Sequence, residues 1–174
     1  LEIVSTHINN NILYCGINDV FRKDEYKQKY LTNSATDFIE AFYTSYDIEY
    51  KMRVDMFEIE RDYEMENKVY ENVVNKYGDK YIVCHFDNPN MNKKEFKHKK
   101  IELGGISTTF FDYIKVLENS TDEMHLIDSV WACLCYLLDA KYGLFKNKKI
   151  YVYAIRDYKY MFLKPYILDN WIII

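Results

Sequence analysis

The hydrophobic and polar positions of the chain form their clearest pattern between residues 123 and 138. Positions 124–127 are a short apolar run that predicts a buried strand. Asp128 and Ser129 follow where a helix N-cap is expected, and apolar residues then recur at helical spacing. These apolar positions are Val130, Cys133, Leu134, Leu137 and Leu138. The pattern predicts a strand that turns directly into an amphipathic helix beginning at Ser129.

Similar patterns predict the other elements. Apolar runs predict strands at 80–87, 101–106 and 149–155, and helical repeats predict helices at 34–46 and 61–77, the second ending at Gly78. Another helix should start at Thr108 or Thr109 and end at Glu118. Its apolar residues are expected to face inward, namely Phe110, Phe111, Ile114 and Leu117.

Three segments have weaker patterns. Residues 1–33 lack a clean period and are expected to be irregular with some helix. Residues 48–59 alternate loosely, which predicts a connector or a strand. The apolar end of the chain, 162–174, should pack back on the body or on whatever precedes Leu1, because its Trp and Ile side chains are too apolar to be left in water.

The order of elements from residue 80 onward indicates the fold class. Strand, loop, strand, helix, strand, helix, strand predicts an α/β fold, with a Rossmann-like parallel sheet, flanking helices and right-handed crossovers. A length of 174 residues fits one such domain but not two. We therefore expect a mostly helical N-terminal or linker region at 1–78 and a Rossmann-like domain at 79–174.

Composition narrows the class of protein. Hydrophobic residues make up 49% of the chain, with only 2 Pro and 5 Gly, which predicts a folded domain. A net charge of -4 argues against general nucleic-acid binding, and no apolar run approaches the ~18 residues that a membrane span needs. The four cysteines have no C-x-x-C spacing, which favours reduced, buried thiols and a cytoplasmic location.

Asp128 and Ser129 are the first candidates for chemistry. One interpretation is an ordinary N-cap. The other is a phosphate site, in which the Ser129 hydroxyl and the amides of residues 129–131, including Val130, donate to a phosphate or diphosphate. Neither a G-x-G-x-x-G fingerprint nor a P-loop is present, so a dinucleotide or P-loop nucleotide site is not supported.

Other candidates stand at strand and helix ends. His85 and Asp87 lie at the carboxyl end of the first clear strand. The His85 imidazole could contact a phosphate or act as acid or base, or it could belong to the core. Glu118 could accept ribose hydroxyls and Arg156 could neutralise phosphate, although ordinary surface positions would explain both. His125 is expected in the core or an interface. No clustered metal ligands are found, so neither a metal nor another cofactor is expected, and a phosphohydrolase would lack its acidic metal cluster.

From residue 80 to the end, the chain resembles the C-terminal, donor-binding half of GT-B glycosyltransferases. The resemblance rests on the segments YIVCHFDNP, FFDYIKVLENSTDEMHLIDSVWACLCYLLDAKYG and YVYAIRDY. Upstream, the segment FYTSYDIEYKMRVDMFEIERDYEMENKVYENVV resembles the linker and first helix of the same group. An H-D-D-P-x-R-G pattern typical of the group is partly kept at 85–89, and its Arg-Gly is missing.

The resemblance implies a nucleotide-diphospho-sugar as partner, bound without metal at the carboxyl edge of the sheet. Segment 125–131 would lie against the diphosphate, and an acidic residue near Glu118 would hold the ribose. A GT-B enzyme needs two domains, so the companion is expected to be a preceding N-terminal domain or a second copy in a homo-oligomer. The alternative is a non-catalytic interaction or structural module on a degenerate glycosyltransferase-like fold, favoured by the missing Arg-Gly and the many aromatic residues.

Overall fold

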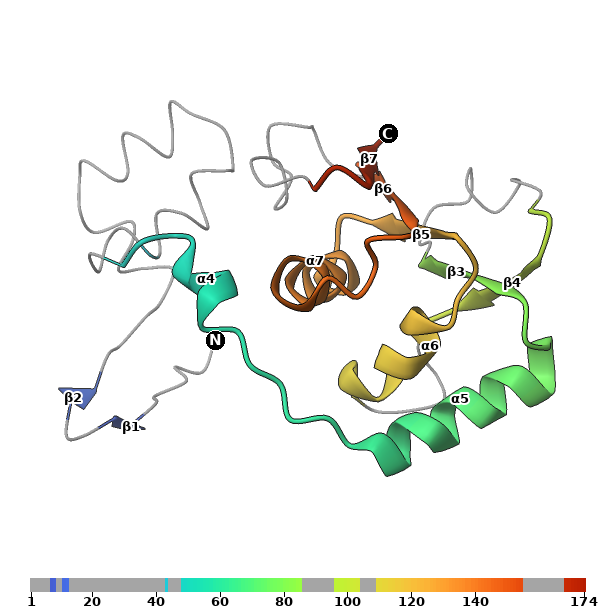
Figure 1. Ribbon diagram of the computed structural model, residues 1–174, viewed down its shortest axis with the longest axis horizontal. Coiled ribbons are helices and arrows are strands. Elements are labelled where there is room, and N and C mark those ends of the chain that lie inside the picture. Colours follow the sequence, from blue (N-terminus) through green and yellow to red (C-terminus); the bar gives the residue numbers. More distant parts are fainter. Residues whose placement is uncertain are drawn as a thin grey trace.

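The computed structural model describes residues 7–8, 11–12, 43, 48–85, 96–103, 109–154 and 168–174. Within them, five parallel strands form one sheet in the order β4-β3-β5-β6-β7 (Figure 1). The strands are β3 (Tyr81–His85), β4 (Lys99–Glu102), β5 (Glu123–Ile127), β6 (Lys149–Tyr153) and β7 (Trp171–Ile173). Helices flank this sheet, so the predicted α/β, Rossmann-like fold is confirmed.

The strand order creates a reversal between β3 and β5. The chain passes from β3 to β4 on one side, and then to β5 on the other side of β3. All later strands are added beyond β5. Loops on the two sides of such a reversal leave in opposite directions, and the resulting crevice at the carboxyl ends of the strands is where open α/β sheets bind ligands.

The longer helices cover the same face of the sheet (Figure 1). They are α5 (Tyr63–Tyr77), α6 (Ile114–Glu118), which continues the 3-10 turn η1 (Phe111–Tyr113), and α7 (Val130–Tyr142). The crossovers from β4 to β5 and from β5 to β6 step in the same direction, and right-handed connections then place α6 and α7 on one face. Alternate strand residues, such as Val83, Leu126 and Val152, form a single core with these helices.

The helix predicted at 61–77 is confirmed, and its ends have local causes. Asp62 is the N-cap of α5 and its carboxylate accepts a hydrogen bond from the Met65 amide at 3.0 Å. Gly78 ends the helix with a φ of 90°, a backbone angle that favours glycine. Val69 and Val73 of α5 belong to the same core as the sheet, so this core crosses the predicted boundary at residue 78.

Two local predictions have different outcomes. Residues 48–59, predicted as a connector or a strand, form a connector that contains the short helix α4 (Met52–Asp55), in which the Met56 amide closes a helical turn on the Met52 carbonyl at 2.8 Å. Phe110 and Phe111 do not face inward, since 41% and 48% of their surface is exposed. The tight η1 turn rotates the following residues, so that Tyr113 is buried instead.

The two ends of the chain differ in how far the structure describes them. Trp171 is buried and β7 pairs with β6, so the C-terminal end packs on the body as predicted, although Ile174 is 57% exposed. Near the N-terminus, β1 (His7–Ile8) and β2 (Asn11–Ile12) form a small antiparallel pair. The helix predicted at 34–46 lies outside the described residues except for Tyr43, which is helical. None of the described helices combines the length and the hydrophobicity needed to cross a bilayer.

Candidate functional site

The structure brings two predicted site residues together at the reversal between β3 and β5. His85 is the last residue of β3, and Ser129 follows β5 by one turn. The register pairs His85 with Leu126, so both strands end at the same edge. The Ser129 Oγ and the His85 Nδ1 are 3.1 Å apart, in hydrogen-bond contact. Both side chains are half-buried.

Ser129 is the N-cap of α7 but does not cap it with its side chain. Its backbone is extended, with φ -150° and ψ 178°, and its carbonyl accepts the Cys133 amide at 3.0 Å. An N-cap serine usually accepts a hydrogen bond from the first turn, whereas this hydroxyl contacts His85. The Ser129 side chain therefore does not accept a hydrogen bond from the first N–H groups of α7, and these groups can donate to another acceptor. The helix dipole adds a partial positive charge at the same place.

Asp128 and Val130, the neighbours of Ser129, have opposite environments. Asp128 is 1% exposed, and its amide donates to the Tyr153 carbonyl at 3.2 Å, which ties the turn between β5 and α7 to the end of β6. Its carboxylate is buried below the surface of the site. Val130, the first residue of α7, is 54% exposed, whereas the next residues, Trp131 and Ala132, are buried.

A group of aromatic rings borders the Ser129–His85 pair. Trp131, in the first turn of α7, is only 5% exposed, and its ring lies 6.3 Å from the His85 ring. Phe110 and Tyr113 contact the same indole edge-on, with centroid distances of 4.8 Å and 5.4 Å. Three elements, β3, α7 and η1 with its N-cap residue Phe110, thus meet at this carboxyl edge. We call the rings of His85, Trp131, Phe110 and Tyr113 the aromatic border; the sequence patterns missed Phe110, because helical spacing placed it in the core.

Glu118 lies at the opposite edge of the sheet. Helix α6 runs antiparallel to the strands, and the segment after it reaches the start of β3, where the Thr121 amide donates to the Tyr81 carbonyl at 2.9 Å. One strand length, about 13 Å, separates that edge from Ser129. The structure therefore does not bring Glu118 into the same site as Ser129. Asp112, at the start of the same helical segment, is a buried acidic residue that the sequence patterns did not single out.

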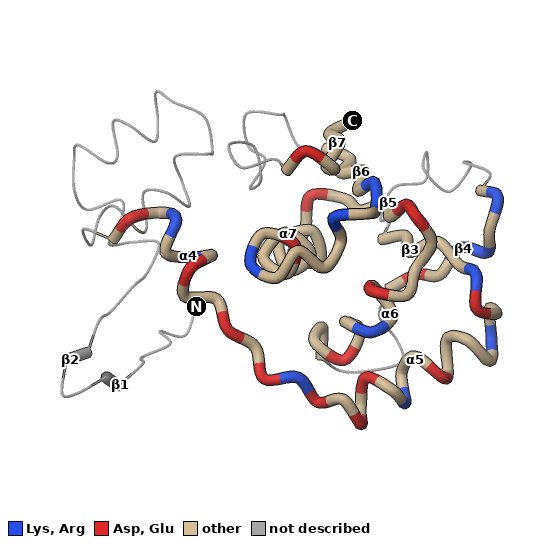
Figure 2. Tube along the Cα trace, in the orientation of Figure 1, with Lys and Arg blue, Asp and Glu red and all other residues tan. Residues whose placement is uncertain are grey.

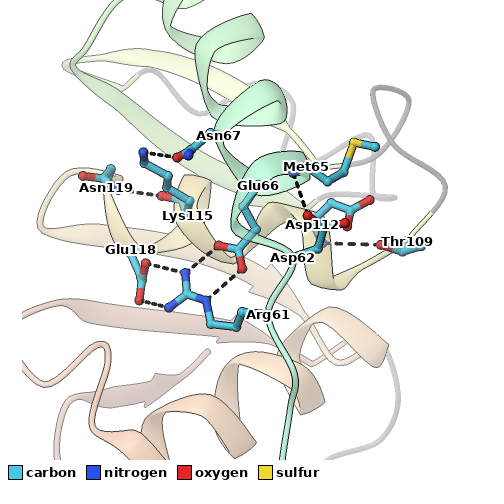
Figure 3. A network of polar contacts seen from close by, with 10 residues as sticks. All are labelled: Arg61, Asp62, Met65, Glu66, Asn67, Thr109, Asp112, Lys115, Glu118 and Asn119. Atoms are coloured by element: carbon cyan, nitrogen blue, oxygen red, sulfur yellow. Dashed lines mark hydrogen bonds and ion pairs between the residues drawn. The ribbon is translucent and has the colours of Figure 1, made fainter.

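Glu118 instead belongs to an ion-pair cluster with Arg61 and Glu66 (Figure 3). The Arg61 guanidinium donates to Glu118 through Nη1 and Nη2, both at 2.9 Å, and to Glu66 through Nε at 2.8 Å and Nη2 at 2.5 Å. The hydrogen bonds that Arg61 donates to Glu66 and, to a smaller extent, to Glu118 raise its pKa. Figure 2 shows that the connector into α5 is mainly acidic around this arginine. The cluster ties the connector, α5 and α6 together.

Asp87 and Arg156 lie outside the described residues, so their predicted roles stay predictions.

His125 is fully buried, and it lies on the face of the sheet opposite to the one that α5, α6 and α7 cover. Its ring stacks on Tyr151 at 4.8 Å with an interplanar angle of 9°, and its Nδ1 contacts the Tyr153 hydroxyl at 2.9 Å. This packing agrees with the core position that we predict for His125.

Two cavities of the described part of the chain lie apart from the candidate site, and no metal site is found there. A cavity of about 790 Å³ lies between the α4 segment and α7, with Phe57 and Leu137 in its wall. A polar cavity of about 520 Å³ lies at the amino edge beside Thr121 and Lys149. Neither contains Ser129 or His85. Across the described residues, no group of three His, Cys, Asp or Glu side chains could hold a metal ion.

Comparisons of the chain with protein-family models, with curated proteins and with solved structures give no match. The functional argument therefore depends on the geometry of the carboxyl edge.

Proposed function

We propose that the carboxyl edge between β3 and β5 binds a nucleotide-diphospho-sugar, as the donor-binding part of a GT-B type glycosyltransferase. The observation that carries this proposal is the contact between Ser129 and His85 beside the first turn of α7. The sugar and the acceptor are not specified by these residues.

A diphosphate suits this site for two physical reasons. The first-turn amides of a 13-residue helix are donors without intrahelical acceptors, and the dipole favours an anion there. The Ser129 hydroxyl and the His85 ring, which contact each other in the free protein, can exchange this contact for hydrogen bonds that each donates to phosphate oxygens.

Calorimetric titration with UDP-, GDP- and ADP-sugars tests the proposal. We expect Ser129→Ala and His85→Ala each to weaken binding roughly 10- to 100-fold, the effect of losing one hydrogen bond to a charged group. Ser129→Thr, which keeps the hydroxyl, should retain most of the affinity. His98→Ala is the matched control, because His98 lines the cavity at the amino edge.

Two results would refute the donor site. One is the absence of binding at millimolar nucleotide-sugar while the circular dichroism spectrum shows an intact fold. The other is an affinity that Ser129→Ala and His98→Ala change equally. Transfer or hydrolysis of the sugar, measured with the same ligands, would separate a catalytic chain from one that binds the donor alone.

A second candidate function is a non-catalytic interaction module, and one observation favours it. Phe110, Phe111 and Val130 expose 41%, 48% and 54% of their surface at the carboxyl edge. Such apolar groups also suit contact with another protein surface, including a second copy of the chain. Sedimentation velocity would then show association that Val130→Ser and Phe111→Ser abolish, with no effect of nucleotide-sugars.

A further inference from the structure

Phe110 is a partly exposed ring that is nevertheless held in place. Its ring contacts Trp131 edge-on, with a centroid distance of 4.8 Å and an interplanar angle of 80°. Trp131 is itself fixed, since it is 5% exposed and packs against Tyr113 at 5.4 Å. The Phe110 ring is therefore positioned by the core while 41% of the residue remains exposed.

The backbone around Phe110 is also fixed. The Phe110 carbonyl accepts the Tyr113 amide at 3.3 Å, and the Thr109 hydroxyl accepts the Asp112 amide at 3.4 Å. These bonds define the η1 turn that keeps Phe110 out of the core. A ring that is ordered in the free protein can contact a ligand at a low cost in side-chain entropy.

Phe110 is connected to the Ser129–His85 pair through Trp131. Trp131 follows Ser129 by two residues, and its indole contacts the His85 ring at 6.3 Å and the Phe110 ring at 4.8 Å. A ligand whose phosphates lie on Ser129 and His85 would cross the edge of Trp131 to reach Phe110. In a nucleotide the ribose likewise stands between the base and the diphosphate.

We propose that the Phe110 ring, supported by Trp131, stacks against the base of the bound nucleotide, so that the site selects nucleotides over sugar phosphates. This inference depends on the proposed donor site and adds a residue that determines specificity. Aromatic stacking suits any base, because every base presents a π-face. The ring therefore favours a nucleotide as a class and leaves the choice between bases to other contacts.

The two tryptophans of the chain allow a direct test. Trp171→Phe leaves Trp131 as the single tryptophan, next to the proposed base site, and its emission can be excited selectively over that of the 18 tyrosines. UDP, ADP and GDP should change its emission and bind more tightly than inorganic pyrophosphate or glucose 1-phosphate. Phe110→Ala should weaken the three nucleotides roughly 5- to 150-fold and leave pyrophosphate affinity unchanged.

Matched variants keep the test decisive. Phe110→Tyr should retain nucleotide affinity, and Phe110→Leu, which preserves an apolar side chain without a ring, should lose it. Tyr142→Ala is the control, because Tyr142 is similarly exposed at the other end of α7, 44% against 41%. It should leave all affinities unchanged.

The outcomes distinguish this inference from the proposed function. If pyrophosphate binds and nucleotides bind no more tightly, or if Phe110→Ala weakens both equally, the stacking role is refuted and the phosphate site stands. If neither nucleotides nor pyrophosphate bind at millimolar concentration while the fold is intact, the donor site and the stacking role are both refuted.

Discussion

Replacement of Arg61 by Met should destabilise the fold through the ion-pair cluster of Arg61, Glu66 and Glu118. The guanidinium makes four hydrogen bonds to the two carboxylates, and Arg61 is 19% exposed. Met fills a similar volume but leaves both carboxylates without their shared partner. Glu66 is the more costly of the two, because its side chain is 1% exposed whereas that of Glu118 is 26% exposed.

The expected cost follows from these burials. Removing one partner of a buried ion pair costs ~3–5 kcal/mol. Glu118 can regain water, so the low end of that range, about 3 kcal/mol, applies here. For a chain of this length a loss of that size lowers the melting temperature by roughly 6–12 °C. Glu118→Gln leaves the Glu66 pair intact and should cost about 1 kcal/mol.

Urea unfolding followed by circular dichroism measures these free energies. Arg61→Lys should fall between wild type and Arg61→Met, because one ammonium cannot bond both carboxylates in a fork. Lys51→Met is the control, since Lys51 pairs with Glu49 on the surface at 2.8 Å and its loss should have no measurable effect. If Arg61→Met is as stable as that control, the reasoning about the cluster is wrong.

Three further predictions concern buried polar groups and thiols. Asp139→Ala should cost about 3 kcal/mol in urea unfolding, because this 3%-exposed carboxylate accepts three hydrogen bonds, including the Trp171 Nε1 at 2.9 Å; a cost under about 1 kcal/mol would contradict this. Iodoacetamide should modify the half-buried Cys133 before Cys135, because complete burial raises the pKa of the Cys135 thiol; mass spectrometry of the native protein would show the reverse order if this is wrong. Burial raises the pKa of both Cys135 and Tyr81, so the unfolded chain loses these protons first as the pH rises. The free energy of unfolding should therefore be unaffected by them below about pH 8, where both groups are protonated in either state, and fall above it, and Tyr81→Phe should reduce the fall near and above about pH 10.

Local patterns were sufficient for most of the α/β domain. The strand at 124–127, the turn at Asp128 and Ser129 and the helix behind them are adjacent in sequence, so hydrophobic spacing and capping chemistry predict them directly. Parallel strands also end at a common edge, which is why His85 and Ser129 could each be assigned to the carboxyl edge before their neighbours were known.

Tertiary structure decided which of these residues meet. The contact between Ser129 and His85 exists because β3 lies beside β5, and strand order is not encoded in local periodicity. Glu118 is at the far edge because α6 runs antiparallel to the sheet, and Phe110 is exposed because η1 changes the rotation of the chain by a fraction of a turn. Spacing along the sequence identifies which residues could share an element, whereas a binding site depends on distances between elements that only the packed sheet and helices determine.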